Sequence, residues 1–471
     1  MSSSSENRPR PRVGDELELT IDRLTYGGEG IGRIDGMVVF VGDSTPADRV
    51  RARVQRSHRR HIEAELLSVE SPSADRIPAR CRHVAQACGG CTWQHVSYAA
   101  QLAAKAEAVR DSLERIGGYQ GLPIRPILPA PAEIHYRNKM EFAFHPDGTL
   151  GLHPRGAWYE IIRLQECLIG PPIAPTIVKA AQAFVEAHGI SCFHPKVRQG
   201  LLRELCLRQS RATGEILVGI VTSPGEFPQA RAMAAHLAAV EPRVASVVRS
   251  LRCAADGPAP LSGTTLLHGR EYITEITAGL RFRIHVDTFF QTNSAQAERL
   301  VEVVKTLAGD VAGAHVVDVY CGVGLFSLVM AAAGAQVTGV EIVETAVEAA
   351  RGNAAENDLT SLVFHAGDAR KVLADVLPAG LGPEVLLLDP PRAGAGGKVM
   401  RRIARACPKR IVYVSCNPTT LARDLTELSP FGYEITAVQP IDMFPQTYHV
   451  ETVVALERTS ASTTDTPNPS S

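Results

Sequence analysis

The sequence predicts an α/β protein whose C-terminal part is a doubly wound, Rossmann-like domain. From about residue 293 onward, strand-like and helix-like stretches alternate strictly, which is typical of a parallel sheet covered by helices. Residues 13–70 instead alternate apolar and polar side chains in short runs separated by glycines, which indicates a small OB-like β-barrel. The region between these two parts is predicted to be mixed α+β, and it contains closely spaced cysteines.

Length and charge set the outline of this organisation. With 471 residues, 45% of them hydrophobic, the chain can form about two to four domains. The net charge of −1 gives no general attraction for polyanions, so a nucleic-acid surface needs local segregation of charge. The predicted divisions are a disordered start at 1–12, the barrel at 13–70, a central domain at 71–290, the sheet domain at 291–458 and a disordered tail at 459–471.

The composition also excludes several classes of protein. The N-terminus is rich in Ser, Arg and Pro, and no stretch is apolar enough for a secretory signal or a membrane span. Ten cysteines in a chain without a signal do not indicate a disulfide scaffold. We therefore expect a cytoplasmic protein with no membrane partner, in which clustered cysteines bind metal or take part in catalysis.

Within the barrel, basic side chains are concentrated in one segment. Asp48 is the single acid in a stretch whose basic residues are Arg49, Arg51, Arg53, Arg56, His58, Arg59, Arg60 and His61. Such a segment is either the solvated face of a strand or a contact surface for nucleic acid. The residues of this segment alone favour neither alternative.

Four cysteines form a candidate metal site. Cys81, Cys88 and Cys91 lie in one loop, and Cys167 is a distant fourth thiol. Four thiolates suit either zinc or an iron–sulfur cluster. The glycines at 89 and 90 favour iron–sulfur, because they let backbone amides approach cluster sulfurs. The alternative is a chance grouping of cysteines in a loop.

The central domain offers fewer functional signals. We predict a helix over 98–116, a strand over 136–144, a strand over 215–221 and a helix over 228–240. Arg137 and Lys139 alternate with Tyr136 and Asn138 at the start of the first of these strands. They present either a basic edge to RNA phosphates or an ordinary solvated strand edge.

Polar residues at successive strand ends predict a nucleoside cofactor. The segment 318–324 follows a strand and places glycines at the start of a helix, which allows close approach of a ligand. Glu341 can accept both ribose hydroxyls, although capping of the next helix is an alternative. Asp368 can accept from an adenine amino group, and Asp389 precedes a rigid Pro-Pro turn. Without a P-loop lysine, this pattern favours S-adenosylmethionine over triphosphates.

A cysteine and a carboxylate predict covalent chemistry at the same sheet edge. Cys416 follows the apolar run 411–414, and Glu451 comes about thirty residues later. A thiolate added at carbon 6 of a pyrimidine turns carbon 5 into a nucleophile, and a carboxylate can then remove the carbon-5 proton. The alternative for Cys416 is a small buried residue at a strand end.

These motifs together resemble a known family. The segment 13–70 resembles the TRAM domain, an RNA-binding barrel, in its turn at 26–30, and this resemblance favours RNA contact by the basic segment of the barrel. Nearly the whole chain resembles the TrmA/RlmD-type RNA uracil-5-methyltransferases at 136–140, 289–293, 318–324, 389–394, 415–424 and 444–451. The resemblance implies S-adenosylmethionine contacts from Gln291, Tyr320, Glu341, Asp368 and Asp389, Cys416 as nucleophile, Glu451 as base, and a 4Fe–4S cluster on Cys81, Cys88, Cys91 and Cys167.

The expected partner is RNA bound by a monomeric enzyme. The barrel and cysteine loop together resemble the ribosomal RNA branch of the family, so large-subunit ribosomal RNA is the first expectation and transfer RNA the alternative. Two departures stand out: Leu325 replaces an Asn found in many members, and six residues separate Cys81 from Cys88 in place of five.

Three other functions fit parts of the sequence. An amino-group methyltransferase uses a similar Asp-Pro-Pro turn but needs no thiol nucleophile. A radical methylthiotransferase joins a TRAM barrel to a cluster, but with other cysteine spacing and a C-terminal barrel. A non-catalytic RNA-binding protein needs neither Cys416 nor Glu451.

Overall fold

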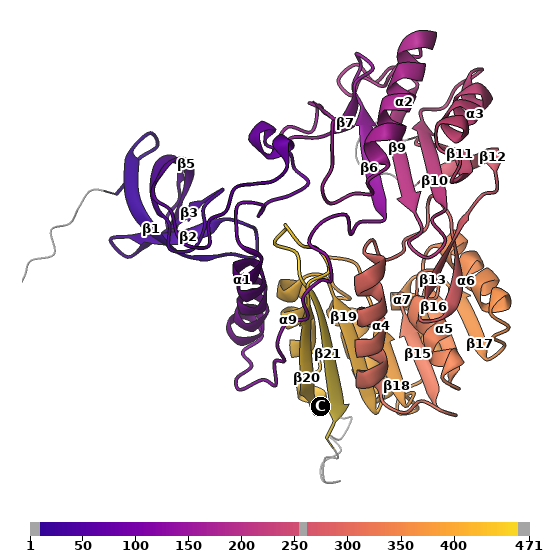
Figure 1. Cartoon of the computed structure of the whole chain (residues 1–471). Coiled ribbons are helices and arrows are strands. Elements are labelled where there is room, and N and C mark those ends of the chain that lie inside the picture. Colours follow the sequence, from indigo (N-terminus) through magenta and orange to yellow (C-terminus); the bar gives the residue numbers. More distant parts are fainter. Residues whose placement is uncertain (1–9, 254–260, 460–471) are drawn as a thin grey trace, which may run out of the picture.

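The computed structural model describes residues 10–253 and 261–459, which form a barrel, a central domain and a large sheet domain (Figure 1). The segments 1–9 and 460–471, which hold most of the predicted disordered ends, lie outside the described residues. Among the helices of the described part, none has the length and apolar character needed to cross a membrane.

The N-terminal segment folds as the predicted barrel. Its strands close in the order β1-β2-β3-β5-β4. They are β1 (Glu16–Leu24), β2 (Gly30–Ile34), β3 (Met37–Val41), β4 (Arg49–Ser57) and β5 (His61–Ser71). Side chains of β1 and β4 alternate between exposed and buried, so the aliphatic ones fill the barrel and the arginines of β4 face outward. Apolar packing therefore stabilises the barrel, and its basic residues lie on the outer surface.

A connecting segment with one long helix follows the barrel. It contains η1 (Arg82–Gln86), α1 (Tyr98–Asp111) and the π-helical turn η2 (Ser112–Ile116), so the predicted helix 98–116 changes its hydrogen-bond pattern in the last turn. Lys105 of α1 is fully buried and forms an ion pair with Asp442 at 2.5 Å. This buried pair fixes α1 against the C-terminal segment that carries the candidate site.

The central domain is a mixed sheet with two helices. Its strands run in the order β12-β11-β10-β9-β6-β7-β8. They are β6 (Lys139–Phe144), β7 (Leu150–Leu152), β8 (Ile162–Arg163), β9 (Leu202–Gln209), β10 (Ile216–Thr222), β11 (Val244–Leu251) and β12 (Ser262–Gly269). The helices α2 (Ala174–His188) and α3 (Ala230–Val240) contribute apolar side chains to the same buried cluster as β6, β9 and β10. The hairpin β13 (Ile273–Thr277) and β14 (Leu280–Ile284) leads to the next domain.

The sheet domain confirms the Rossmann-like prediction with one difference. Its order is β17-β16-β15-β18-β19-β21-β20. The strands are β15 (His315–Val319), β16 (Gln336–Glu341), β17 (Leu362–Ala366), β18 (Val385–Leu388), β19 (Arg410–Ser415), β20 (Tyr433–Ile441) and β21 (Glu451–Arg458). The expectation of a wholly parallel sheet was wrong for β21, which pairs antiparallel with both β19 and β20. As a result β21 begins at the edge where the parallel strands end.

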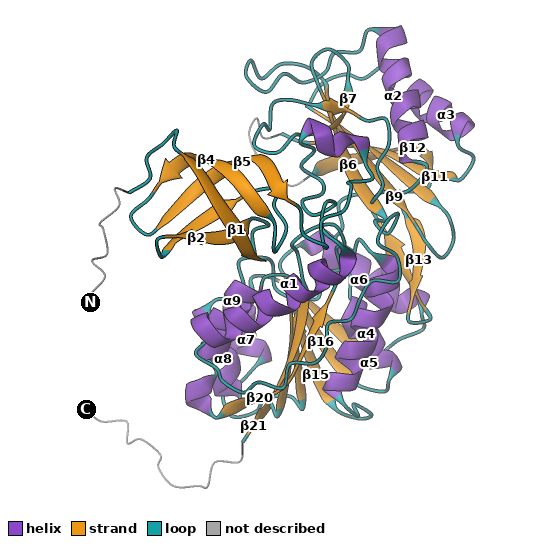
Figure 2. Ribbon diagram, turned by 60° about the vertical axis from the view of Figure 1, so that its left-hand side comes forward, coloured by secondary structure: helices purple, strands orange, loops and turns teal. Residues whose placement is uncertain are grey.

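Helices cover both faces of this sheet (Figure 2). On one face lie α4 (Ser294–Ala308), α5 (Leu325–Ala332) and α6 (Glu344–Glu356), and on the other α7 (Ala369–Val376), α8 (Gly397–Ala406) and α9 (Pro418–Thr426). The short turn η3 (Ser429–Phe431) follows α9. Two large apolar clusters, one on each face, bury strands β15 to β21, so the carboxyl edge of the sheet is held rigidly for a binding site.

Candidate active site

A cavity of about 730 Å³ opens at the carboxyl edge of the sheet domain. Its walls come from the ends of β15, β16, β17, β18 and β19, from the start of β21 and from the segment before α4. All seven residues assigned to cofactor binding and catalysis line it: Gln291, Tyr320, Glu341, Asp368, Asp389, Cys416 and Glu451. Side chains separated by up to 160 positions thus meet in a single pocket.

The glycine loop after β15 shapes one side of the cavity. Gly322 and Gly324 have φ of +53° and +87°, and the space where a Gly322 side chain would lie is open. Glu341, at the end of β16, accepts hydrogen bonds from the amides of Gly322 at 3.1 Å and Val343 at 2.9 Å. The acid therefore organises the loop as well as facing the cavity.

Asp368 lies where a base of a nucleoside cofactor was expected, but it already has a partner. It caps α7 by accepting from the amide of Arg370 at 2.9 Å, and the Arg370 guanidinium forms an ion pair with its carboxylate. These hydrogen bonds lower the pKa of Asp368 to about 2. Arg370 also lines the cavity, a residue that the sequence reasoning did not find.

Leu325 and Gln291 form two further parts of the cavity wall on the proposed cofactor side. Leu325, at the start of α5, is buried and lines the cavity, so this part of the cavity wall is apolar. Gln291 is buried, and its backbone carbonyl accepts a hydrogen bond from the side-chain amide of Asn138 at 3.0 Å. That contact joins the strand β6 region of the central domain to the cavity wall.

The opposite side of the cavity carries acidic and thiol groups. Burial, helped by the charge of Asp318, raises the pKa of Asp389 to about 7. Burial is also the main cause that raises the pKa of Cys416 to about 12, and nearby Glu451 adds to it. Burial and then Asp389 raise the pKa of Glu451 well above 4.5. A carboxyl group with a raised pKa is a stronger base than one in water.

The antiparallel strand brings the thiol and the carboxyl group together. Ser415, the last residue of β19, pairs with Thr452 of β21. Cys416 comes directly after Ser415 and Glu451 directly before Thr452, so the two residues lie at the same end of this strand pair. Arg392 and His449 line the same part of the cavity, with their nitrogens 3.5 Å apart. Burial lowers the pKa of His449 to about 4, so its imidazole is neutral at physiological pH.

The barrel reaches this site through Tyr26. The Tyr26 hydroxyl donates a hydrogen bond to the backbone carbonyl of Cys416 at 3.0 Å. Its ring lies edge to face with Tyr448 at a centroid distance of 5.7 Å, and Tyr448 in turn contacts His449. Sequence reasoning noted this turn only as a feature of the barrel, and nothing in the sequence connects residues that are 390 positions apart.

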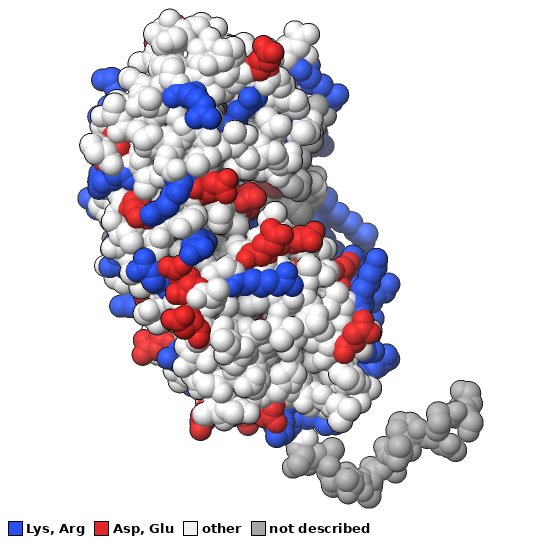
Figure 3. Space-filling model, turned by 90° about the vertical axis from the view of Figure 1, so that its right-hand side faces the viewer, with Lys and Arg blue, Asp and Glu red and all other residues white. Residues whose placement is uncertain are grey.

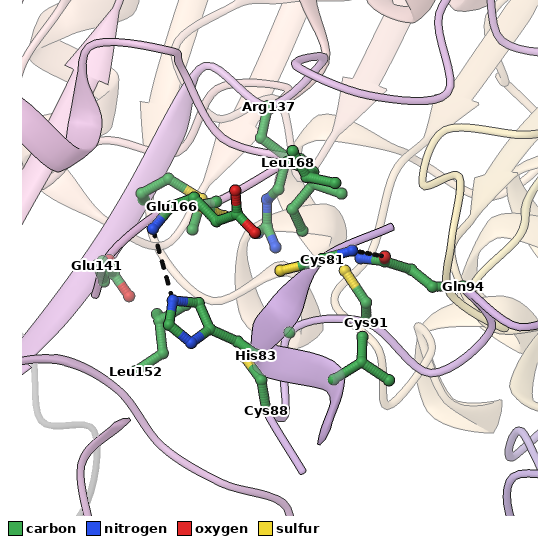
Figure 4. A pocket seen from close by; sticks show the side chains of 15 residues that line it. Cys81, His83, Cys88, Cys91, Gln94, Arg137, Glu141, Leu152, Glu166 and Leu168 are labelled. Atoms are coloured by element: carbon green, nitrogen blue, oxygen red, sulfur yellow. Dashed lines mark hydrogen bonds between the residues drawn. The ribbon is translucent and has the colours of Figure 1, made fainter. Parts of the chain in front are cut away.

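The four cysteines line a separate cavity of about 190 Å³ (Figure 4). Cys81, Cys88, Cys91 and Cys167 are all free thiols. Hydrogen bonds to neighbouring segments hold the cysteine loop in place. The Cys81 amide donates to the Gln94 side chain at 3.0 Å, and the His83 ring accepts from the amide of Gln165 at 3.1 Å. The predicted ligand set is thus assembled around one space.

The two basic residues near the start of β6, Arg137 and Lys139, contact other parts of the protein. Arg137 lines the cysteine cavity, and its Nε is buried without a hydrogen-bond partner among the described residues (Figure 4). Lys139 pairs with Glu141 at 2.6 Å. Neither of the two alternatives, a basic edge for RNA phosphates or a solvated strand edge, describes Arg137, because its side chain lines the cysteine cavity (Figure 4).

Comparison with known proteins agrees with this fold. The model of the tRNA (uracil-5-)-methyltransferase family matches residues 262–459, and that of the TRAM domain matches residues 10–67. RNA methyltransferases of uncharacterised function from Chlorobaculum tepidum and Thermosynechococcus vestitus are 36% and 38% identical. These matches cover 95% and 94% of this chain and 98% of each relative.

A solved structure is similar over nearly the full length. The tRNA (uracil-54, C5)-methyltransferase of Pyrococcus abyssi, in complex with S-adenosyl-L-homocysteine, has a TM-score of 0.73 and 29% identity. The match covers 93% of this chain and 100% of that one. The fold and the cavity define a class I methyltransferase joined to a TRAM barrel. The chain belongs to the family of S-adenosylmethionine-dependent RNA (uracil-5-)-methyltransferases.

Proposed function

We propose that this enzyme methylates carbon 5 of one specific uridine in RNA through a covalent adduct between the pyrimidine and Cys416. The observation that carries the proposal is the presence of Cys416 and Glu451 in the same cavity as the five residues assigned to the cofactor. An amino-group methyltransferase needs no thiol beside its Asp-Pro-Pro turn, so this pairing favours carbon methylation over the alternative.

The proposed reaction uses each of these groups once. S-adenosylmethionine supplies an electrophilic methyl group, held by Gln291, Tyr320, Glu341, Asp368 and Asp389. The Cys416 thiol gives its proton to water, its sulfur bonds to carbon 6 of the uracil, and the electron pair of the carbon 5–carbon 6 double bond moves toward the carbon-4 carbonyl. Carbon 5 then takes the methyl group and the thioether S-adenosylhomocysteine leaves. Glu451 removes the carbon-5 proton, the bond between sulfur and carbon 6 breaks, and the double bond is restored.

For the substrate we propose large-subunit ribosomal RNA. The combination of a TRAM barrel with the four-cysteine cavity supports this choice, because the family resemblance associates both with the ribosomal branch. Transfer RNA is the second candidate, favoured by the activity named for the Pyrococcus abyssi enzyme. Mapping 5-methyluridine in total RNA from cells with and without the gene distinguishes them: loss of a ribosomal site supports the first, and loss of a transfer-RNA site the second.

We also propose that Cys81, Cys88, Cys91 and Cys167 hold a 4Fe–4S cluster. Thiolates around a single zinc ion lie about 3.8 Å apart, given Zn–S bonds of about 2.3 Å. Among the described residues, no three cysteine sulfurs lie within 4.8 Å of one another. The wider spacing fits a cubane better than a single ion. Arg137, whose buried Nε lacks a partner, adds a positive charge beside the anionic cluster.

The cluster proposal predicts iron in the purified protein. Protein isolated without oxygen should be brown and contain about four irons per chain, because a four-cysteine cubane holds that number. Elemental analysis of the wild type and of Cys91→Ser should show the iron lost in the variant. One zinc per chain and no iron in the wild type would replace the cluster with a structural zinc site.

The outer face of the barrel is the proposed electrostatic surface for RNA. Arg49, Arg51 and Arg53 on β4 lie 3.3–3.8 Å from glutamates of β1, and Arg56 lies 3.2 Å from Glu63. Arg59 and Arg60 at the hairpin end are exposed and have no acidic partner among the described residues. By contrast, acidic and basic side chains are interspersed on the face turned away from the barrel (Figure 3). The hairpin end is therefore the stronger candidate for phosphate contacts.

Neutralising this hairpin end should weaken RNA binding without changing the choice of uridine. In the triple variant Arg56→Gln, Arg59→Gln, Arg60→Gln, affinity should fall for all sequences, and the salt dependence should flatten by roughly one unit of slope per lost phosphate contact. Titrations at several salt concentrations measure both quantities. The matched control, Lys179→Gln, Arg231→Gln, Lys305→Gln, removes three exposed charges elsewhere. If the Arg56, Arg59, Arg60 variant binds RNA with unchanged affinity and salt slope, these arginines do not contact RNA and form only a solvated surface.

A further inference from the structure

Two loops of the central domain bring an aromatic pair and a lysine together at the surface. The loop 153–161 between β7 and β8 carries Trp158 and Tyr159, and the loop 193–201 before β9 carries Lys196. Trp158 is 63% exposed and Tyr159 44% exposed. The rings meet edge to face at 6.0 Å, and Lys196 Nζ lies 4.8 Å from the centre of the Tyr159 ring. We call these three side chains the Trp158 platform.

The platform has no part in the core of the protein. Neither ring belongs to a buried apolar cluster of the described residues. The other tryptophan of the chain, Trp93, shows the usual arrangement: it is 1% exposed and donates its indole N–H to the carbonyl of Gly28 at 2.9 Å. Two adjacent exposed aromatic rings therefore call for an external partner.

The loop that carries the rings is anchored to two other parts of the molecule. The Gly89 amide donates to the His153 carbonyl at 3.0 Å, and the Arg155 amide donates to the Ala87 carbonyl at 2.8 Å. Arg155 also pairs with Asp43 of the barrel at 2.8 Å. The loop that carries the two rings is thus held at the junction of the barrel, the cysteine loop and the central domain.

The chemistry of the platform suits unpaired bases with their phosphates. The two loops carry Arg155, Lys196 and Arg198 against the single acid Glu160. Exposed aromatic rings stack on bases of any sequence once these are splayed out of a helix, and neighbouring cations contact the backbone. A continuous duplex keeps its bases stacked on each other and offers no free face to Trp158.

We propose that the Trp158 platform stacks one or two unpaired bases of the substrate RNA, away from the uridine that is methylated. This inference rests on the RNA substrate of the proposed function, but not on the covalent mechanism. It gives the enzyme a second, shape-dependent contact that selects single-stranded or looped regions.

Tryptophan fluorescence tests the contact directly, because one tryptophan is exposed and the other is buried. Titrating the full-length protein with a short unstructured oligoribonucleotide should quench the emission of Trp158. The same oligonucleotide annealed to its complement should quench far less. In Trp158→Phe the quenching should vanish while binding is retained, because a phenylalanine ring still stacks.

Binding measurements separate stacking from electrostatics. Trp158→Ala should weaken binding of the unstructured oligonucleotide by roughly five- to a hundredfold, the cost of losing one stacked base. Its salt slope should stay that of the wild type, because no phosphate contact is lost. Leu381→Ala, at a residue 75% exposed in the loop before β18, is the control and should bind as the wild type does.

The proposal fails if RNA binds with full affinity to Trp158→Ala, or if wild-type emission does not change on saturation with the unstructured oligonucleotide. Equal quenching by single strand and duplex would also overturn it, since that result indicates a backbone contact near the ring. All of these readouts are binding signals, so an enzyme that binds RNA but lacks the proposed covalent chemistry would leave the inference intact.

Discussion

Replacing Cys416 by alanine should abolish methyl transfer, with a loss of at least about a thousandfold in rate. The reason is chemical: carbon 5 of uracil is not nucleophilic until a sulfur has added at carbon 6. Among the described residues, Cys321 is the other thiol that lines the cavity, but it follows β15 in the glycine loop and is only 7% exposed. S-adenosylmethionine binding should survive the substitution, because none of the five assigned contacts is removed.

RNA carrying 5-fluorouridine at the target reveals the adduct itself. Fluorine replaces the proton that Glu451 removes, so the wild-type reaction should stop after methyl transfer with protein and RNA covalently joined. A complex that survives denaturation should form with the wild type and with Cys253→Ala, whose thiol is exposed and outside the cavity. A denaturation-resistant complex in Cys416→Ala would assign the nucleophile to another residue.

Replacing Glu451 by glutamine should block the reaction one step later. The amide cannot accept the carbon-5 proton, so methyl transfer should occur once, the adduct should accumulate on ordinary uridine, and steady-state turnover should fall by roughly 10²- to 10⁴-fold. Quenched-flow analysis on denaturing gels measures both the burst and the adduct. Glu434→Gln, an exposed change on the neighbouring strand β20, should behave as the wild type. Full turnover by Glu451→Gln would mean that another base, or water, removes the proton.

Local patterns in the sequence predicted most of the fold. The alternation of apolar strands with helices predicted β15 to β19, because each strand and each helix has its own hydrophobic period in the sequence. Parallel pairing of these strands then places their carboxyl ends at one edge of the sheet. The direction of β21 was not predictable in this way. A strand's direction depends on which neighbour it pairs with, and β21 pairs with β19 across about 35 positions of intervening chain.

The parts of the site that the sequence did not predict come from contacts between domains. Tyr26 reaches the Cys416 carbonyl because α1, through the buried Lys105 and Asp442 pair, holds the connecting segment against the sheet domain. Arg137 turns inward because the cysteine loop folds over β6. Periodicity along the chain carries no information on such docking. The common position of Cys416 and Glu451 in the cavity was predictable, because the proposed chemistry requires a thiol and a carboxylate beside the cofactor site.

The central claim is that the methyl group goes to carbon 5 of a uridine with loss of the proton there. RNA labelled with tritium at carbon 5 of its uridines tests this claim directly, together with S-adenosylmethionine carrying a carbon-14 methyl group. The account predicts that the wild-type enzyme releases one tritium to water for each methyl group transferred, and that Cys416→Ala releases none. Methyl transfer without tritium release would contradict the account, because the methyl group would then be on a ribose, an amino group or another ring atom.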